Sequence, residues 1–171
     1  EVLYYKKALE IKPKSDIANN NIGTAYISLG NLEKAKFHLQ QAIEINSKFY
    51  QALNNLGGIL LSEGDKENAI LYFKKAIEIN PKYAEAYRTL SSNIKFNFDD
   101  NLIHDMQKIN KSSTTSEYDK MHINFALGKA HDDIGSYSEA FSNLKKGNKI
   151  RKNLLNYNII QDEELFKLIR T

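Results

Sequence analysis

The sequence contains no cysteine and only two prolines, and no apolar run in it is long enough to span a membrane. The lack of cysteine excludes disulfide bonds and thiolate metal sites, and it fits a reducing compartment, so we expect a cytoplasmic protein. Neither sign of charge dominates, since 24 basic residues stand against 21 acidic ones. This near balance removes the electrostatic case for a nucleic-acid partner, and we expect no membrane partner.

What the sequence does contain is a fixed interval. Ala8, Ala42 and Ala76 are each 34 residues apart, and Gly30 and Gly64 keep the same spacing. A period of this length is the signature of a repeat array, in which each unit buries its face against the next. The period therefore predicts an all-α fold, a right-handed superhelix of helix pairs that forms a solenoid.

One period reads as two helices joined by a tight turn. Apolar residues at helical spacing predict a helix over residues 16–29 and a second over 32–46, with Gly30 ending the first. Pro81 is expected to close the second helix of the next unit, because proline cannot continue a helix. Small residues are expected where two helices cross closely, namely at Gly23, Gly57, Ala35, Ala69, Ala42 and Ala76.

These residues resemble the tetratricopeptide repeat family. Its pattern of bulky, small, aromatic and turn residues is matched in residues 50–83 and, with Ser47 in place of the proline, in residues 16–49. The matching positions in residues 50–83 are Leu53, Leu56, Gly57, Leu60, Gly64, Ala69, Phe73, Ala76 and Pro81. The resemblance implies a protein- or peptide-binding module, in which residues 1–15 are part of a preceding unit.

The period then slips and recovers. Gly135 follows Gly64 by 71 residues, three more than two periods, so the unit at 84–120 is expected to be irregular and longer than its neighbours. We place the excess at residues 111–115, in a polar loop near 111–116. A helix is expected over 101–109 after an N-cap at Asp99 or Asp100. The expected organisation is a regular array at 1–83, the irregular pair at 84–120, and a divergent unit at 121–171 that ends in a capping helix around 161–170.

The segment from Phe125 to Lys152 is more particular than a generic repeat. It is similar to the last repeats of bacterial proteins that join tetratricopeptide repeats to a C-terminal sulfotransferase domain. That resemblance implies a following domain that uses 3′-phosphoadenylyl sulfate, for which these residues would present the acceptor. The sequence begins and ends within helical patterns, so we expect a fragment, rich in the residues of an AT-rich microbial genome. No phosphate-cradling loop is present, and we expect this fragment to be non-catalytic, without cofactor or metal.

The first helix of each unit is expected to line a concave, peptide-binding face. The residues at equivalent positions on it are Asn20, Asn21, Thr24, Asn54, Asn55, Gly58, Arg88, Thr89 and Ser92. Asn21 and Asn55 resemble the asparagine ladder of the protein-modifying N-acetylglucosamine transferases, in which amides bind a peptide backbone. The alternative is that these asparagines cap local backbone groups. The lysines and arginines that clamp chaperone carboxylates are missing, so that type of site is rejected.

Other charged residues suggest weaker sites. Lys145, Lys149 and Lys152 share one helical face and could meet an anion or a catalytic domain, or simply face solvent. His131 takes a core position of the repeat, and no two histidines have metal-ligand spacing. Besides peptide binding and acceptor presentation, a third hypothesis is an assembly scaffold that uses the open repeat ends. We expect a monomer or weak self-association.

Overall fold

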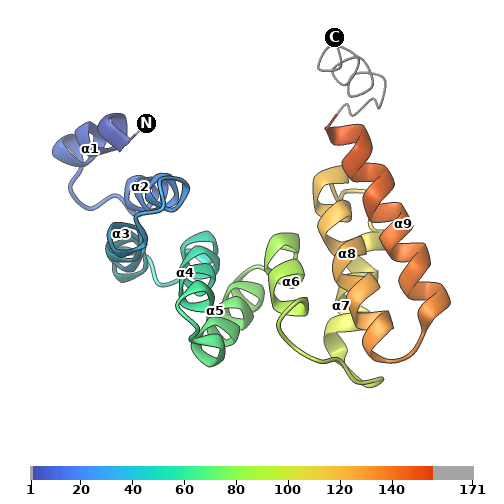
Figure 1. The fold of residues 1–171 in the computed structure, drawn as a ribbon. Helices are drawn as coiled ribbons and strands as arrows, with labels where there is room; N and C mark the ends of the chain where they lie inside the picture. Colours follow the sequence, from blue (N-terminus) through green and yellow to red (C-terminus); the bar gives the residue numbers. More distant parts are fainter. Residues whose placement is uncertain (1, 156–171) are drawn as a thin grey trace, which may run out of the picture. The chain divides into compact units, whose positions relative to one another are not determined.

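The structure is a computed structural model that describes residues 2–155. Every regular element in that range is an α-helix, which confirms the predicted all-α repeat fold (Figure 1). The helices of the described residues are α1 (Val2–Ile11), α2 (Asp16–Ser28), α3 (Leu32–Ile45), α4 (Tyr50–Ser62), α5 (Lys66–Ile79), α6 (Ala84–Ser91), α7 (Asn101–Lys111), α8 (Glu117–Asp133) and α9 (Tyr137–Leu154). None of these helices is both long enough and apolar enough to cross a membrane. The capping helix expected around residues 161–170 lies outside the described residues.

The described residues form two compact units, one ending at Phe96 and the other beginning at Asn97. In the first unit each helix from α1 to α6 packs against the next along the chain, and the equivalent helices α2 and α4 also touch. In the second unit α8 packs against both α7 and α9. Within each unit the helices therefore stack in chain order, as in a repeat array.

Three tight turns have the same construction. Gly30, Gly64 and Gly135 have φ angles of 73°, 87° and 76°, a conformation that costs glycine little. After α2, the N–H of Gly30 donates to the carbonyl of Ile27 at 3.0 Å, and the N–H of Asn31 donates to that of Tyr26 at 2.9 Å. This pair of bonds is the Schellman motif, which satisfies carbonyls left open at a helix end. The predicted turn glycines are thus confirmed.

The second helix of a pair ends in the same way with and without proline. In α3 the cap is Asn46, whose side-chain oxygen accepts from the N–H of Lys48 at 3.1 Å. In α5 the cap is Asn80, which accepts from the N–H of Lys82 at 3.1 Å. Because the asparagine performs the capping in both units, Ser47 can replace the proline without moving the helix end.

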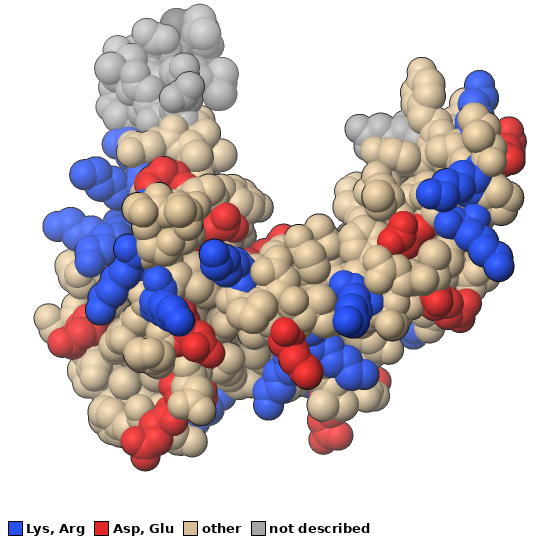
Figure 2. All heavy atoms as spheres, turned by 180° about the vertical axis from the view of Figure 1, so that it is seen from behind, with Lys and Arg blue, Asp and Glu red and all other residues tan. Residues whose placement is uncertain are grey.

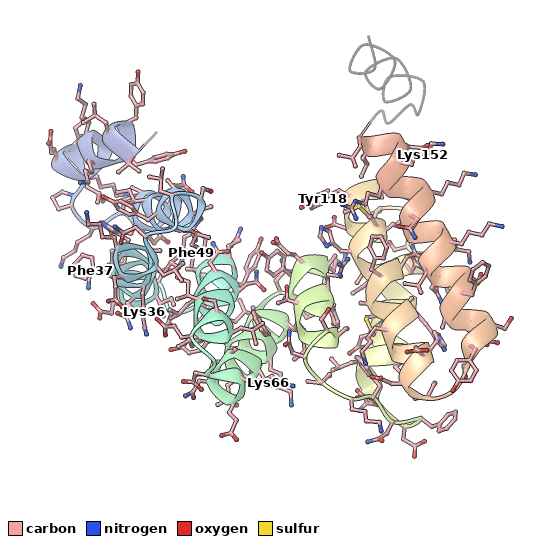
Figure 3. All side chains as sticks on the ribbon, viewed as in Figure 1. Lys36, Phe37, Phe49, Lys66, Tyr118 and Lys152 are labelled. Carbon is pink, nitrogen blue, oxygen red and sulfur yellow. The ribbon has the colours of Figure 1, made fainter. Side chains whose placement is uncertain are left out.

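The core of the first unit forms where helices of adjacent pairs meet. Its buried side chains come from α2, α3 and α4, and Phe49 packs against them just before α4 (Figure 3). The crossings are close at Gly23 and Gly57, where an added Cβ would lie 2.7 Å from atoms of Leu39 and Phe73 respectively. The predicted role of these glycines in close helix packing is confirmed. The cluster contains Ile22, Tyr26, Ala35, Leu39, Ala42, Ala52, Leu56 and Ile59.

The loop between α7 and α8 spans residues 112–116, and the helix that follows it is longer than its counterpart in a regular repeat. The helix α8 has 17 residues against 13 in α4, and it begins earlier relative to its turn glycine. Ser116 caps it, with its hydroxyl accepting from the N–H of Asp119 at 3.0 Å. With Ser116 as the cap, α8 begins directly after the polar run, and the loop between α7 and α8 comprises residues 112–116. The predicted cap of α7 is Asp100, which accepts from the N–H of Leu102 at 3.0 Å.

Candidate functional site

The predicted peptide-binding residues lie on α2, α4 and α6 or directly after α6. We call this surface the first-helix face; it comprises Asn20, Asn21, Thr24, Asn54, Asn55, Gly58, Arg88, Thr89 and Ser92. At its innermost position Asn20 and Asn54 are only 8% and 6% exposed. One turn further on, Thr24, Gly58 and Ser92 are exposed. The face therefore combines buried amides with open positions beside them.

Asn55 joins two neighbouring repeats. Its amide nitrogen donates to the side-chain oxygen of Asn20 at 3.2 Å and to the hydroxyl oxygen of Thr24 at 3.2 Å. A primary amide has two hydrogens to donate, so both are used inside the protein. The group that Asn55 can still offer to a ligand is its amide oxygen.

We expect Asn55→Ala to lower the free energy of unfolding by about 1–2 kcal/mol, because two inter-repeat hydrogen bonds are lost and the buried Asn20 loses a donor. Urea denaturation followed by far-UV circular dichroism measures this change. Asn148→Ala, which alters an exposed amide of α9, is the matched control and should change stability by less than about 0.5 kcal/mol. Equal effects of the two substitutions would contradict a structural role for Asn55.

Between α4 and α6 the first-helix face has different side chains from those between α2 and α4. Where the first pair of repeats has Asn55 and Thr24, the second has Thr89 and Gly58. The hydroxyl of Thr89 donates to the backbone carbonyl of Glu85 at 3.1 Å. The side-chain oxygen of Asn54 is buried and has no hydrogen-bond partner among the described residues. The inter-repeat link that the first pair forms is therefore not repeated here.

A groove of about 370 Å³ lies on this part of the first-helix face. Of the predicted residues, Asn54, Asn55, Gly58 and Thr89 line it, whereas Arg88, Ser92 and the three from α2 do not. The lining residues that sequence reasoning did not single out are Ile27, Leu32, Ile59, Ser62 and Glu85. The only charged group among them is the Glu85 carboxylate, which accepts from the Tyr83 hydroxyl at 3.0 Å. The groove thus offers amides and hydroxyls beside apolar side chains, without a cation.

The buried amide of Asn19, on the same helix as Asn20, bonds to other groups of the fold. Asn19 is 5% exposed; its nitrogen donates to the carbonyl of Ser15 at 3.0 Å, and its oxygen lies 3.0 Å from Nδ1 of His38. Burial lowers the pKa of His38, and the positive charge of Lys6 lowers it further. The neutral ring, with its proton on Nδ1, can donate to Asn19. The Asn19 oxygen is therefore engaged within the fold and is not available to a ligand.

The three lysines predicted on α9 do not all line the same groove. Lys149 lines a groove of about 800 Å³ in the second unit, but Lys145 and Lys152 do not. Lys146 lines it instead, together with Lys111 of α7 and Lys120 of α8. His131, predicted to be packed in the core, is half-buried and also lines this groove. Across the described residues, no group of three histidine, aspartate or glutamate side chains could hold a metal ion.

Comparisons with known proteins agree with this architecture. A profile of the tetratricopeptide repeat family matches residues 17–49 and 50–83. No curated protein sequence matches the chain. Several solved structures do, all at low identity, and such likeness shows the fold alone.

One similar structure is that of MamA, which is 22% identical, covers 91% of this chain and 90% of its own, and has a TM-score of 0.61. BtubC from P. vanneervenii is 18% identical over 90% of this chain and 73% of its own, with a TM-score of 0.64. A mutant O-GlcNAc transferase from Thermobaculum terrenum is 19% identical, with a TM-score of 0.54, and the match covers 75% of this chain but 22% of that enzyme.

The repeat pattern, the Schellman turns and the close crossings at glycine all agree with the profile match. Residues 17–49 and 50–83 are therefore tetratricopeptide repeats within an all-α helical repeat fold, the kind of repeat that forms protein–protein interaction modules.

Proposed function

We propose that the first unit binds an extended segment of a partner protein along the first-helix face, with the groove at Asn54 as the point of main-chain recognition. One observation carries the proposal. Asn54 lines the groove, and its buried amide oxygen has no hydrogen-bond partner among the described residues. A buried acceptor without a donor costs about 1–3 kcal/mol, which a donor from a ligand would recover.

An extended peptide supplies such a donor at each residue. Rotation about the last torsion of an asparagine side chain is soft, so the Asn54 amide can turn toward the groove with little strain. An amide both donates and accepts, and it can therefore pair with a main chain whatever its side chains are. Ile27, Leu32 and Ile59 provide an apolar wall for one side chain of the segment. The Glu85 carboxylate disfavours an acidic residue there.

Gly58→Leu tests this function by filling the groove. An added Cβ at Gly58 meets nothing within 4 Å, so the substitution leaves the fold intact while its side chain enters the open space. Peptides would be selected from a displayed random library on the unaltered protein, and their affinities measured by fluorescence anisotropy. We expect the substitution to weaken binding by at least about tenfold.

Ser142→Leu, at an exposed position of α9, is the control and should leave the affinity unchanged. Asn54→Leu is a second test variant, because it replaces the unpaired acceptor by an apolar side chain of similar volume. It should weaken peptide binding without lowering the free energy of unfolding. Selected peptides that bind equally well to the Gly58→Leu protein would overturn the proposal.

Two finer hypotheses remain predictions. The sulfotransferase hypothesis rests on the resemblance of the segment from Phe125 to Lys152, and it requires a longer chain in which a strand and a Gly-rich, Ser/Thr-bearing loop follow these residues. The scaffold hypothesis requires self-association through the repeat ends, and light scattering over a range of concentrations tests it. A strictly monomeric protein would exclude the scaffold.

A further inference from the structure

The second unit carries a groove that we call the basic groove, defined by Lys111, Lys120, Lys146, Lys149 and Glu117, and its volume is about 800 Å³. Its lining comes from three helices, with Lys111 on α7, Lys120 on α8 and the other two lysines on α9. Figure 2 shows Lys and Arg side chains gathered along the side of the second unit that carries α9. A volume of this size is typical of ligand-binding clefts.

The charges in the basic groove are unequal. Four lysines stand against one acid, although the whole chain is close to neutral. Glu117 is paired with Lys120 at 3.0 Å. Lys111, Lys146 and Lys149 form no ion pair with any described residue. Three cations that converge on one groove from two helices repel one another, and an anionic ligand would relieve that repulsion.

The same position in a regular repeat is smaller and has fewer charged side chains. Between α3 and α5, over Leu56 and Leu60 of α4, the corresponding groove has a volume of only about 260 Å³. Tyr72 and Lys36 both line it, and the Lys36 ammonium is paired with the Glu63 carboxylate at 2.7 Å (Figure 3 labels Lys36). This hydrogen bond raises the pKa of Lys36. The regular groove is therefore small and without free charge.

In the second unit, polar residues replace two residues that line the regular groove. Counting from the turn glycines Gly64 and Gly135, His131 stands where Leu60 would be and Asn143 stands where Tyr72 would be. Nδ1 of His131 is buried without a hydrogen-bond partner among the described residues, although the side chain lines the groove. Polar residues at core positions of a repeat oppose its packing, and such conflicts mark functional sites.

The floor of the basic groove is held in place by an amide pair. Asn124, which is 3% exposed and stands where Leu53 would be, exchanges two hydrogen bonds with Asn110 at 3.0 and 3.4 Å. Asn124 also donates to the carbonyl of Lys120 at 2.7 Å. This pair ties α7 to α8. It thereby holds the helix backbone that carries Lys111 against the helix that carries Lys120.

We propose that the basic groove binds a short acidic segment of a partner protein, with carboxylates facing Lys111, Lys146 and Lys149. This site is separate from the first-helix face and does not depend on the function proposed for it. Spaced single charges suit carboxylates that are spaced along a peptide, and the amides of Gln107, Asn143 and Asn153 in the lining can pair with its main chain.

The lining argues against other anions. It contains no phenylalanine, tyrosine or tryptophan, and its one aromatic ring is that of the half-buried His131, so it lacks the row of rings on which the successive bases of a single strand stack. It contains no arginine either, so the fork that holds a phosphate through two parallel bonds is missing. A peptide rich in glutamate or aspartate is the occupant that the charges and amides fit best.

The test uses a fluorescein-labelled octaglutamate peptide and fluorescence anisotropy at low salt, where surface charges are least screened. Two variants each remove two positive charges from α9, so that net charge is matched. We expect K146A/K149A to weaken binding about tenfold, and K145A/K152A, whose lysines lie outside the groove, to change it less than about twofold.

A third variant keeps every lysine and narrows the groove. His131→Leu with Asn143→Tyr introduces the side chains of the regular repeat, and it should weaken octaglutamate binding at least about fivefold while the far-UV spectrum is retained. Equal weakening by the two charge-matched variants would overturn the proposal, because it would show diffuse attraction. Unchanged affinity of the His131→Leu, Asn143→Tyr protein for octaglutamate would also overturn it. A third contrary result would be an oligouridylate that binds through Lys146 and Lys149 while octaglutamate does not bind.

Discussion

Phe73→Ala is expected to lower the free energy of unfolding by about 3–5 kcal/mol. Phe73 lies on α5 with none of its surface exposed, and its ring packs against the backbone of α4 at Gly57. Glycine has no side chain that could move into the space, so the cavity left by the ring cannot collapse from that side. Domains of this size are stable by only about 5–15 kcal/mol, and the loss is therefore a large share of the total.

Urea denaturation monitored by far-UV circular dichroism measures the loss, and Phe141→Ala is the matched control. Phe141 is 69% exposed, so the same chemical change there should cost less than about 1 kcal/mol. If the two substitutions destabilised the protein equally, the packing of Phe73 against Gly57 would not be a principal contact of the repeat.

The parts of the fold that depend on local conformation could be predicted from the sequence. A helix that must reverse within three residues needs a positive φ, and Gly30 and Gly64 satisfy that requirement one period apart. The slip of the period was also visible, but the residue at which α8 begins was not. Ser116 lies in a polar run, and a polar run looks the same whether it forms a loop or the capped start of a helix.

The basic groove could be predicted only in part, because it depends on packing between helices. The spacing of Lys145, Lys149 and Lys152 identifies one face of α9, but it does not say which neighbour that face meets. Lys111 and Lys120 line one groove with Lys149 because α8 packs against both α7 and α9, which no local pattern encodes. A comparison of His131 with Leu60 at the same repeat position was the signal that could have located the groove.

The first-helix face shows a similar limit. Equivalent repeat positions place Thr89 where Asn55 would be and Gly58 where Thr24 would be. They did not reveal that Asn55 is bonded to Thr24 across the repeats, whereas Thr89 donates to a carbonyl of its own helix. The hydrogen bonds of Asn55 cross between repeats, and they require an oxygen at Asn20 and a hydroxyl at Thr24 together. Where the partner is Gly58, the link is lost and a groove opens. The chemistry of the face therefore changes where a repeat position departs from its equivalent.

Alanine at Gly57 and alanine at Gly58 are expected to have opposite effects, although the two residues are adjacent in α4. A Cβ at Gly58 meets no atom within 4 Å, so the higher helix propensity of alanine should raise stability by about 0.5–1 kcal/mol. A Cβ at Gly57 would lie 2.7 and 3.0 Å from two ring atoms of Phe73. Because that ring is fully buried, we expect a net loss of about 1–2 kcal/mol.

Combining the substitutions identifies the cause. In the Phe73→Ala background the ring that meets the new methyl group is gone, so Gly57→Ala should become neutral or stabilising, with a coupling energy of about 1–3 kcal/mol. Gly128→Ala gives the comparison within the second unit, where the Cβ would lie 2.6 Å from Leu144. Leu144 is 39% exposed and can rotate outward, so the cost there should be smaller. A loss at Gly57 that persists without the Phe73 ring would mean that the glycine is required by the backbone of α4 itself, not by the close approach of α5.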